Sequence, residues 1–200
     1  MASAAADVDV VLITTPDREI ANVAAVIEPG AAAVLHCSGA TSLAAVSGHE
    51  RHGSLHPLMA LPDPATGASR LCDNGWFAVA GDPVSVELAE KLGGRYFAVS
   101  DVDRAIYHAT AAVSANHLVA LLGQVERLAA AAGVPAAAFF DLARGSFDDV
   151  VARGASAALT GPAARGDTET IAAHIASLPE AERSLYTSLA AAAQALSVDG

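Results

Sequence analysis

A buried strand that leads directly into a helix start is the first element of this chain, and this order recurs through residues 1–100. Residues 8–14 form an apolar run rich in β-branched side chains, which is typical of a strand buried on both faces. Asp17 then predicts the cap of a helix that Pro29 and Gly30 end. Further strands are predicted at residues 32–36, 77–80 and 96–99, with helices at residues 41–46 and 83–92. This alternation predicts an α/β domain with a mostly parallel sheet and helices on its faces.

The pattern becomes purely helical after Ser100. Ser100 and Asp103 predict a capping box for a long helix over residues 101–132, and Gly133 ends that helix. The helix is apolar on most of its sides, so we expect it to be buried in its own domain or against a partner chain. Three more helices are predicted at about residues 136–153, 168–178 and 180–196. The chain therefore divides into an α/β domain of residues 1–100 and an all-α domain of residues 101–200.

Composition limits the classes of partner. The net charge of −11 argues against nucleic acid and anionic membranes, and the aromatic content of 4% argues against a platform for stacked bases. Cys37 and Cys72 lie outside any C-x-x-C motif, which favours a reducing compartment. Asp7 and Asp9 interrupt the N-terminal apolar run, so no signal peptide is predicted. The longest apolar stretch, residues 128–140, is too short to span a bilayer, and we predict a soluble, cytoplasmic protein.

Two polar segments follow predicted neighbouring strands. The loop from His36 to Gly39 lies beyond the carboxyl end of its strand, where open α/β sheets bind ligands. Ser38 is therefore placed to donate to a substrate oxygen, and a plain Ser-Gly turn is the favoured alternative. The segment Thr14-Thr15-Pro16 ends the preceding strand at the same edge and is placed to line a cofactor, although a bare helix N-terminus explains it equally well.

Three histidines, His49, His52 and His56, are spaced by three and four residues, which invites a metal-site hypothesis. A zinc site normally needs a fourth ligand and a scaffold that holds two ligands on one face. Glycine residues around these histidines break any helix, so the spacing has no such geometric meaning. We therefore predict no metal site, and interpret His56 with Pro57 and Leu58 as the end of a short strand that points into a cleft.

Asn116 and His117, with Ser114 nearby, lie midway along the predicted long helix. Asparagine and histidine are unfavourable inside a helix unless a partner stabilises them. A polar cluster on a mostly apolar helix indicates the lining of a site. A satisfied hydrogen-bond network buried between helices is an alternative of equal weight.

The segment from Leu159 to Asp167 is the sharpest local signal. Two glycines and a proline predict an irregular loop that carries Thr160, Arg165 and Asp167. An arginine held in this way suits a substrate carboxylate or phosphate. The alternative is a structural Arg165–Asp167 pair that fixes the loop. Asp167 or Thr168 then caps the next helix.

Taken in chain order, these segments resemble one known family. The matching segments are Thr15-Pro16-Asp17, His36-Cys37-Ser38-Gly39-Ala40, His56-Pro57-Leu58, Ser114-x-Asn116-His117-Leu118-Val119 and Thr160-Gly161-Pro162-x-x-Arg165-Gly166-Asp167. The chain resembles the Rossmann-like proteins with a C-terminal helical domain of unknown function (domain of unknown function 2520). These look like relatives of ketopantoate reductase, pyrroline-carboxylate reductase and the 6-phosphogluconate dehydrogenase-like superfamily. The likeness runs from Asp7 to about Leu196, and the last of the five segments is its most specific motif.

The resemblance implies an NAD(P)-binding first domain, a helical domain that often forms homodimers, and hydride transfer to or from a small carbonyl, imine or hydroxy acid. The implied cofactor is NADP or NAD, contacted by Thr14, Thr15 and Pro16. The implied contacts of a small anionic or carbonyl substrate are Ser38, Gly39, His56, Asn116, Thr160, Arg165 and Asp167. In this scheme Ser38 and Asn116 hydrogen-bond the reacting oxygen, Arg165 fixes an anionic group, and Asp167 orients Arg165.

The resemblance leaves the catalytic acid to be assigned. The wider superfamily often uses a lysine of the long helix as its acid or base, and the only lysine of this chain is Lys91. His117 is the expected replacement because histidine titrates near neutrality. His108, or a water polarised by Asn116, is the alternative.

The glycine-rich turn that cradles the pyrophosphate in this fold is missing from the sequence. No G-x-G-x-x-G motif occurs, and only residues 1–6 precede the first strand pattern. We therefore expect a chain truncated at its N-terminus, with an incomplete Rossmann-like sheet and with inactivity as one outcome. The alternative function is a non-catalytic dimerising or ligand-sensing module, favoured by the missing turn, the missing lysine and the alanine-faced helices.

Overall fold

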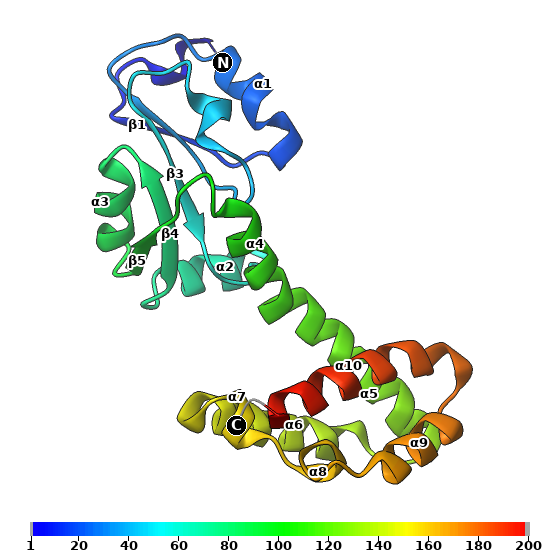
Figure 1. The fold of residues 1–200 in the computed structure, drawn as a ribbon. Coiled ribbons are helices and arrows are strands. Elements are labelled where there is room, and N and C mark those ends of the chain that lie inside the picture. Colours follow the sequence, from blue (N-terminus) through cyan, green and yellow to red (C-terminus); the bar gives the residue numbers. More distant parts are fainter. Residues whose placement is uncertain (1, 199–200) are drawn as a thin grey trace. The chain divides into compact units, whose positions relative to one another are not determined.

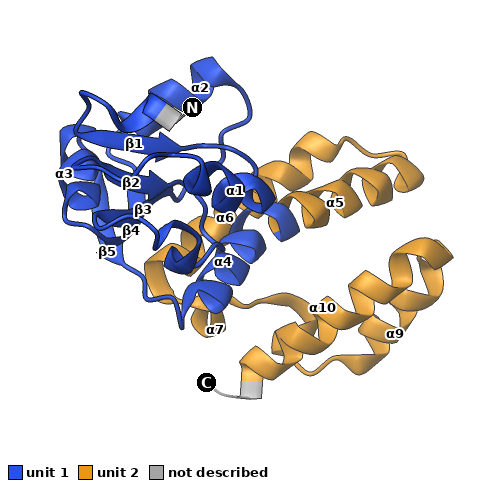
Figure 2. Ribbon diagram, turned by 90° about the horizontal axis from the view of Figure 1, so that it is seen from above, with its two compact units in different colours: residues 1–117 blue, residues 118–200 orange. Residues whose placement is uncertain are grey.

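The structure is a computed structural model that describes residues 2–198 and forms two compact units. The first unit ends at His117 and the second begins at Leu118 (Figure 2). The predicted domain boundary at residue 100 lies just before the long helix, whereas the division between the units falls inside it. The difference has a physical cause, because the first turns of this helix pack against the sheet.

The first unit is built on a five-stranded sheet in the order β1-β2-β3-β4-β5 (Figure 1). Its strands are β1 Val10–Ile13, β2 Ala33–His36, β3 His52–Pro57, β4 Trp76–Gly81 and β5 Arg95–Ala98. All neighbouring strands are parallel except β3 and β4, which are antiparallel. The mostly parallel sheet is therefore confirmed, and its antiparallel step was not predicted.

Side-chain alternation gives each face of the sheet its own apolar core. On one face, Leu35, Leu55 and Phe77 pack with α3 (Val84–Lys91). On the other face, Ile13 and Val34 pack with the helix α1 (Ile20–Ala25) and the short 3₁₀ helix η3 (Leu43–Val46). Neighbouring residues of a strand point to opposite faces, so His36 lies on the same face as Val34.

Two helices of this unit differ from the sequence prediction. Asp17 does not cap α1, which begins at Ile20 after a 3₁₀ turn over Asp17–Glu19, because the Asp17 carboxylate accepts a hydrogen bond from Ser38 instead. The helix α2 (Pro64–Leu71) was missed, although Asp63 caps it through the Thr66 N–H and Pro64 occupies its first turn. The Asp-Pro pair was an available signal for its start.

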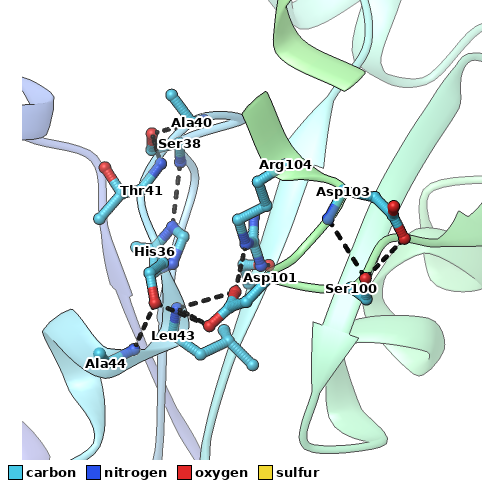
Figure 3. A network of polar contacts seen from close by, with 12 residues as sticks. His36, Ser38, Ala40, Thr41, Leu43, Ala44, Ser100, Asp101, Asp103 and Arg104 are labelled. Carbon is cyan, nitrogen blue, oxygen red and sulfur yellow. Dashed lines mark hydrogen bonds and ion pairs between the residues drawn. The ribbon is translucent and has the colours of Figure 1, made fainter. Parts of the chain in front are cut away.

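The long helix is confirmed but is not uniform. It consists of α4 (Arg104–Ala112), the π-helical turn η4 (Val113–His117) and α5 (Leu118–Ala132). One contact of the predicted capping box is present, since the Ser100 hydroxyl accepts from the Asp103 N–H at 3.3 Å (Figure 3). The Asp103 carboxylate accepts from the Ser100 hydroxyl at 2.6 Å, and α4 itself begins after Asp103. By length and composition alone the helix over 104–132 could cross a membrane. Its first turns nevertheless contact the sheet through polar side chains.

The second unit is helical throughout. After α5 it contains α6 (Ala136–Arg153), α7 (Ala155–Ala158), α8 (Gly161–Ala164), α9 (Thr168–Ser177) and α10 (Glu180–Val198). A polar contact fixes α5 to α10, because Gln124 donates to the Glu182 carbonyl oxygen at 3.0 Å and Arg127 to the Glu182 carboxylate at 2.5 Å. The hydrogen bond from Arg127, with a second one of 3.2 Å from Gln124 to the Glu182 carboxylate, outweighs the effect of burial and lowers the pKa of Glu182.

Candidate active site

A layer of polar side chains separates the sheet from the first turns of α4. His36 and Ser54 are register partners on β2 and β3, and His56 follows on the same face two residues later. Across the antiparallel step, Ala80 and Ala78 oppose Ser54 and His56, and these small side chains leave room for α4. The polar layer consists of His36, Ser54 and His56 from the sheet and Arg104, Tyr107 and His108 from α4.

Arg104 fixes the start of α4 to the sheet and is only 3% exposed. Its guanidinium donates to the Asp101 carboxylate at 2.6 Å (Figure 3). It also donates to the Ser54 hydroxyl at 2.7 Å. Asp101 also accepts from the Ser42 hydroxyl at 2.7 Å and from the Leu43 N–H. Burial raises the pKa of Asp101, but the hydrogen bonds from Ser42, Arg104 and Leu43 outweigh it and keep that pKa below its usual value.

His36 is a fully buried neutral imidazole beside this arginine. Burial, followed by the charge of Arg104, lowers the pKa of His36 to about 4. Its Nδ1 accepts the Ser38 N–H at 3.3 Å, so the neutral ring carries its proton on Nε2. Within residues 2–198 this Nε2 has no hydrogen-bond partner.

His56 and Tyr107 form a hydrogen-bonded pair. The Nδ1 of His56 lies 2.5 Å from the Tyr107 hydroxyl oxygen, and the rings meet edge to face with centroids 5.6 Å apart. Burial and the neighbouring His108 lower the pKa of His56 to about 4. Burial raises the pKa of Tyr107 to about 12. Both groups are therefore neutral at pH 7.

The Ser38 turn joins the loops that follow β1 and β2. The Ser38 hydroxyl donates to Asp17 at 2.7 Å. It also accepts from the backbone N–H groups of Ala40 and Thr41 (Figure 3). These hydrogen bonds stabilise a turn. The hydrogen bond from Ser38 to a substrate oxygen stays a prediction. Gly39 lies directly against the polar layer, because a methyl group there would be 2.8 Å from His56 and 2.9 Å from His108.

The structure thus brings several predicted site residues together at one sheet edge. Ser38, Gly39 and His56 are neighbours, and the exposed segment Thr14-Thr15-Pro16 precedes Asp17, the partner of Ser38. This edge is formed by the carboxyl ends of β1, β2 and β3, where ligands bind in open α/β sheets. The sequence had placed these segments at strand ends without fixing their contacts.

Asn116 and His117 lie further along the same helix, on the π-helical turn, and both are exposed. At 1.5 Å per residue, Asn116 is about 12 Å beyond His108 along the helix axis. The Ser114 hydroxyl donates to the Thr110 carbonyl oxygen at 2.9 Å. Such contacts perturb helix geometry, and π-helical turns often occur at functional sites.

The segment around Arg165 belongs to the second unit and is partly helical rather than an irregular loop. Thr160 precedes α8, whose first residue Gly161 adopts a positive φ of 78° that favours glycine. Asp167 caps α9 as predicted, accepting from the Thr170 N–H at 3.0 Å and the Thr170 hydroxyl at 2.8 Å. Arg165 is therefore paired only loosely with Asp167, at 4.0 Å, and its side chain is 65% exposed.

The three histidines of the metal hypothesis have separate contacts. The His49 Nε2 lies 3.0 Å from the Ala24 carbonyl oxygen, and the His52 Nδ1 lies 2.7 Å from the His49 carbonyl oxygen. His56 contacts Tyr107. Over the described range 2–198, no group of three His, Cys, Asp or Glu side chains is placed to hold a metal ion.

Two members of the polar layer, Arg104 and Tyr107, were missed in the sequence. Their spacing of three residues, with His108 next in line, put them on one face of a helix whose existence was predicted. That stripe was an available signal. What the sequence did not reveal is that this face meets the sheet.

The residues at this edge carry groups that a nucleotide cofactor could contact. They combine the exposed hydroxyls of Thr14 and Thr15 with a neutral tyrosine–histidine pair at the carboxyl edge of parallel strands. The glycine-rich turn that would cradle the diphosphate is not in the sequence.

An α/β unit of this topology, followed by a helical unit, defines the chain as a Rossmann-like protein with a C-terminal helical domain. Residues 77–193, more than half of the chain, match the family described as "Domain of unknown function (DUF2520)". The chain belongs to this family. The predicted fold class and family are thereby confirmed.

Two solved structures resemble the whole chain. Protein TM1727 from Thermotoga maritima is 25% identical, with a TM-score of 0.80 over 96% of this chain and 79% of that chain. The "putative NADP oxidoreductase BF3122" from Bacteroides fragilis is 16% identical, with a TM-score of 0.75 over 93% of this chain and 75% of that chain. The second likeness concerns the fold alone. No curated protein matches the sequence significantly.

Proposed function

We propose that this chain is an NAD(P)-dependent oxidoreductase that transfers hydride to or from a small carbonyl, imine or hydroxy acid. The observation that carries the proposal is the neutral His56–Tyr107 pair at the carboxyl edge of the sheet, beside Thr14 and Thr15. The likeness in fold to a protein named as an NADP oxidoreductase supports it. When bound, the nicotinamide supplies or accepts the hydride.

Different residues of the first unit would contact different parts of the ligand. Thr14, Thr15 and Pro16 would contact the cofactor, and the loop at Ser38 and Gly39 would lie at the reacting end. Asn116 and His117 sit about 12 Å further along the helix than His108, so they would contact a more distant part of the ligand. The resemblance implies that Ser38 and Asn116 hydrogen-bond the same oxygen. Contacts of both residues with one oxygen would have to span this distance of about 12 Å along the helix.

Arg165 would contact an anionic group. The guanidinium of Arg165 is exposed and only loosely paired, so its fork of donors is available to a carboxylate or phosphate. Asp167 is engaged in capping α9 and would hold Arg165 in place. Thr160 adjoins the same helical turn and adds a hydroxyl.

Titration with NADPH and NADH tests the proposal through tryptophan fluorescence. Trp76 is the only tryptophan of the sequence, and its ring centroid lies 5.9 Å from that of Phe97. The Phe97 centroid in turn lies 5.8 Å from the centroid of the Tyr107 ring. We expect a saturable change with either dinucleotide and an about tenfold weaker affinity in Thr15→Val, since one hydroxyl hydrogen bond to a charged group is lost. Thr187→Val, on α10, is the control and should bind as the wild type. No fluorescence change and no heat of binding at millimolar dinucleotide would reject the proposal.

A second candidate function, a dimerising module, has its own observation. The helices α5 and α6 enclose an open apolar groove of about 720 Å³, lined by Leu118, Val119, Leu122, Phe140 and Phe147 among others. Val119 is 70% exposed and Phe147 62% exposed. Exposed apolar surface of this extent marks an interaction site.

We propose that a second copy of the chain covers this groove, forming a homodimer. The rim of the groove carries both signs of charge, with Glu126 and Asp148 opposed by Arg144. The groove therefore carries both partners of an ion pair, which a self-complementary twofold interface can use. The dimer is compatible with the oxidoreductase proposal, and a stable dimer that ignores both dinucleotides would favour the module alone.

Replacing Phe147 with glutamate should convert the dimer to a monomer. The change puts a charge in the centre of the proposed interface, where an uncompensated charge costs several kcal/mol. Sedimentation velocity measures the mass directly. Val102→Glu, at a 91% exposed position of the first unit, should leave the mass unchanged. A wild-type chain that is still monomeric at about 100 μM would contradict the prediction, because a specific dimer should have a dissociation constant at or below this concentration.

A further inference from the structure

We propose that the Tyr107 hydroxyl is the group that exchanges the proton with the reacting oxygen, and that His56 resupplies it. This inference rests on the function proposed above and assigns its proton transfer to residues that the sequence motifs did not include for this role. Tyr107 would be the catalytic residue, and His56 the residue that positions and recharges it.

The geometry holds the phenol in one place. The Tyr107 oxygen lies 2.5 Å from the His56 Nδ1, and the Phe97 ring packs against Tyr107 edge to face at 5.8 Å. His56 is itself held by β3, where the small side chain of Ala78 opposes it. Tyr107 is half-buried, so part of the residue is open to solvent.

The charge state suits proton transfer. Burial raises the pKa of Tyr107 to about 12, so the phenol keeps its proton at neutral pH. The pKa of His56 is lowered to about 4 by burial and by His108, so the imidazole is neutral and has one N–H to give and one nitrogen free to accept. A neutral imidazole can thus lose a proton at Nδ1 and gain one at Nε2 without changing its charge.

The step balances for reduction of a carbonyl. A bound reduced nicotinamide would supply the hydride for the new C–H bond, and the C=O electron pair would move onto oxygen. The Tyr107 O–H bond breaks as that oxygen takes its proton. The phenolate oxygen takes the Nδ1 proton of His56, and His56 Nε2 takes a proton from the solvent, which supplies the one proton that the reduction consumes. Oxidation of a hydroxy acid runs the same transfers in reverse.

Other candidate groups are less well placed. The Ser38 hydroxyl already donates to Asp17 and accepts two backbone N–H groups. His117 lies ten residues beyond Tyr107, about 15 Å along the helix, so the two cannot serve the same oxygen. Tyr107 has His56 as its hydrogen-bond partner, and the His56 ring adjoins the loop at Gly39.

The experiment compares Tyr107→Phe with a matched control in the same chain. Tyr186 also bonds a histidine, with its oxygen 2.7 Å from the His174 Nδ1, but lies in the helical unit. NADPH oxidation is followed with glyoxylate and pyruvate as small 2-oxo acid probes. We expect Tyr107→Phe to lower kcat about 100-fold or more, within the range for loss of a general acid, while its NADPH affinity stays within about twofold. Tyr186→Phe should match the wild type.

A second readout does not depend on turnover. Long-range ¹H–¹⁵N spectra of the histidine rings should show His56 as a hydrogen-bonded neutral ring, and this signature should disappear in Tyr107→Phe while that of His174 persists. Unchanged His56 signals, or turnover of Tyr107→Phe within threefold of an active wild type, would overturn this inference and leave the oxidoreductase proposal standing. A wild type that binds neither dinucleotide and turns over neither probe would overturn both.

Discussion

Replacing Arg104 with alanine is expected to lower the free energy of unfolding of the first unit by about 3 kcal/mol or more, the range for breaking a buried ion pair. Arg104 is 3% exposed and holds α4 to β3 through Ser54. Its removal leaves the buried Ser54 hydroxyl and the Asp101 carboxylate without their strongest donor, and opens a cavity between helix and sheet. Chemical denaturation followed through Trp76, on β4, reports this unit.

A surface pair provides the control for Arg104. Arg153 bonds Asp149 on α6, and both side chains are about half exposed. Arg153→Ala should therefore change the free energy of unfolding by less than about 0.5 kcal/mol. Equal destabilisation by the two alanine variants would mean that the contacts of Arg104 with the sheet contribute no more than a surface pair.

Acidification from pH 6.5 to pH 4 is expected to cost the first unit about 3 kcal/mol of stability through His36. The pKa of His36 in the folded state is about 4, below its unfolded value of 6.5, because of burial and the Arg104 charge. The unfolded chain therefore binds the proton first as pH falls, and stability drops through this window. His56, with its pKa also lowered to about 4, adds in the same direction.

Unfolding free energies of His36→Asn across this window isolate the effect. The variant should have a distinctly flatter pH dependence than the wild type, whatever its stability at pH 7. His117→Asn, at an exposed position, should retain the wild-type slope. Arg104→Ala should also flatten the slope, because the arginine charge helps to lower the pKa of His36. A wild-type slope in His36→Asn would show that its imidazole is not the buried neutral group described above.

Most of the framework could be predicted because it depends on local patterns. The run at residues 32–36 predicts a strand from its apolar continuity alone, and β2 is buried at every position. Ser100 and Asp103 predict a helix start from spacing alone, and their hydrogen bonds are present. The direction of β4 relative to β3 has no such local signal, because it depends on where the chain returns after α2.

The site was less predictable because its residues meet only through the fold. His56 and Tyr107 are far apart in the sequence and are joined by a register between strands and a helix docked on them. The local sequence predicts Asp17 as a helix cap, but in the structure its carboxylate accepts a hydrogen bond from Ser38 instead. The assignments of Ser38, Asn116, His117 and Arg165 to a substrate, like the cytoplasmic location, remain predictions.

The measurement that tests the central claim most directly is a dinucleotide titration observed on the histidine ring signals. The chain has seven histidines, of which His36, His56 and His108 lie in the polar layer and His174 lies in the helical unit. We predict that NADPH or NADH shifts the signals of His56 and His108 in a saturable way and leaves those of His174 in place. Shifts confined to His174, or none from a folded chain at millimolar dinucleotide, would contradict the assignment of the polar layer as the active site.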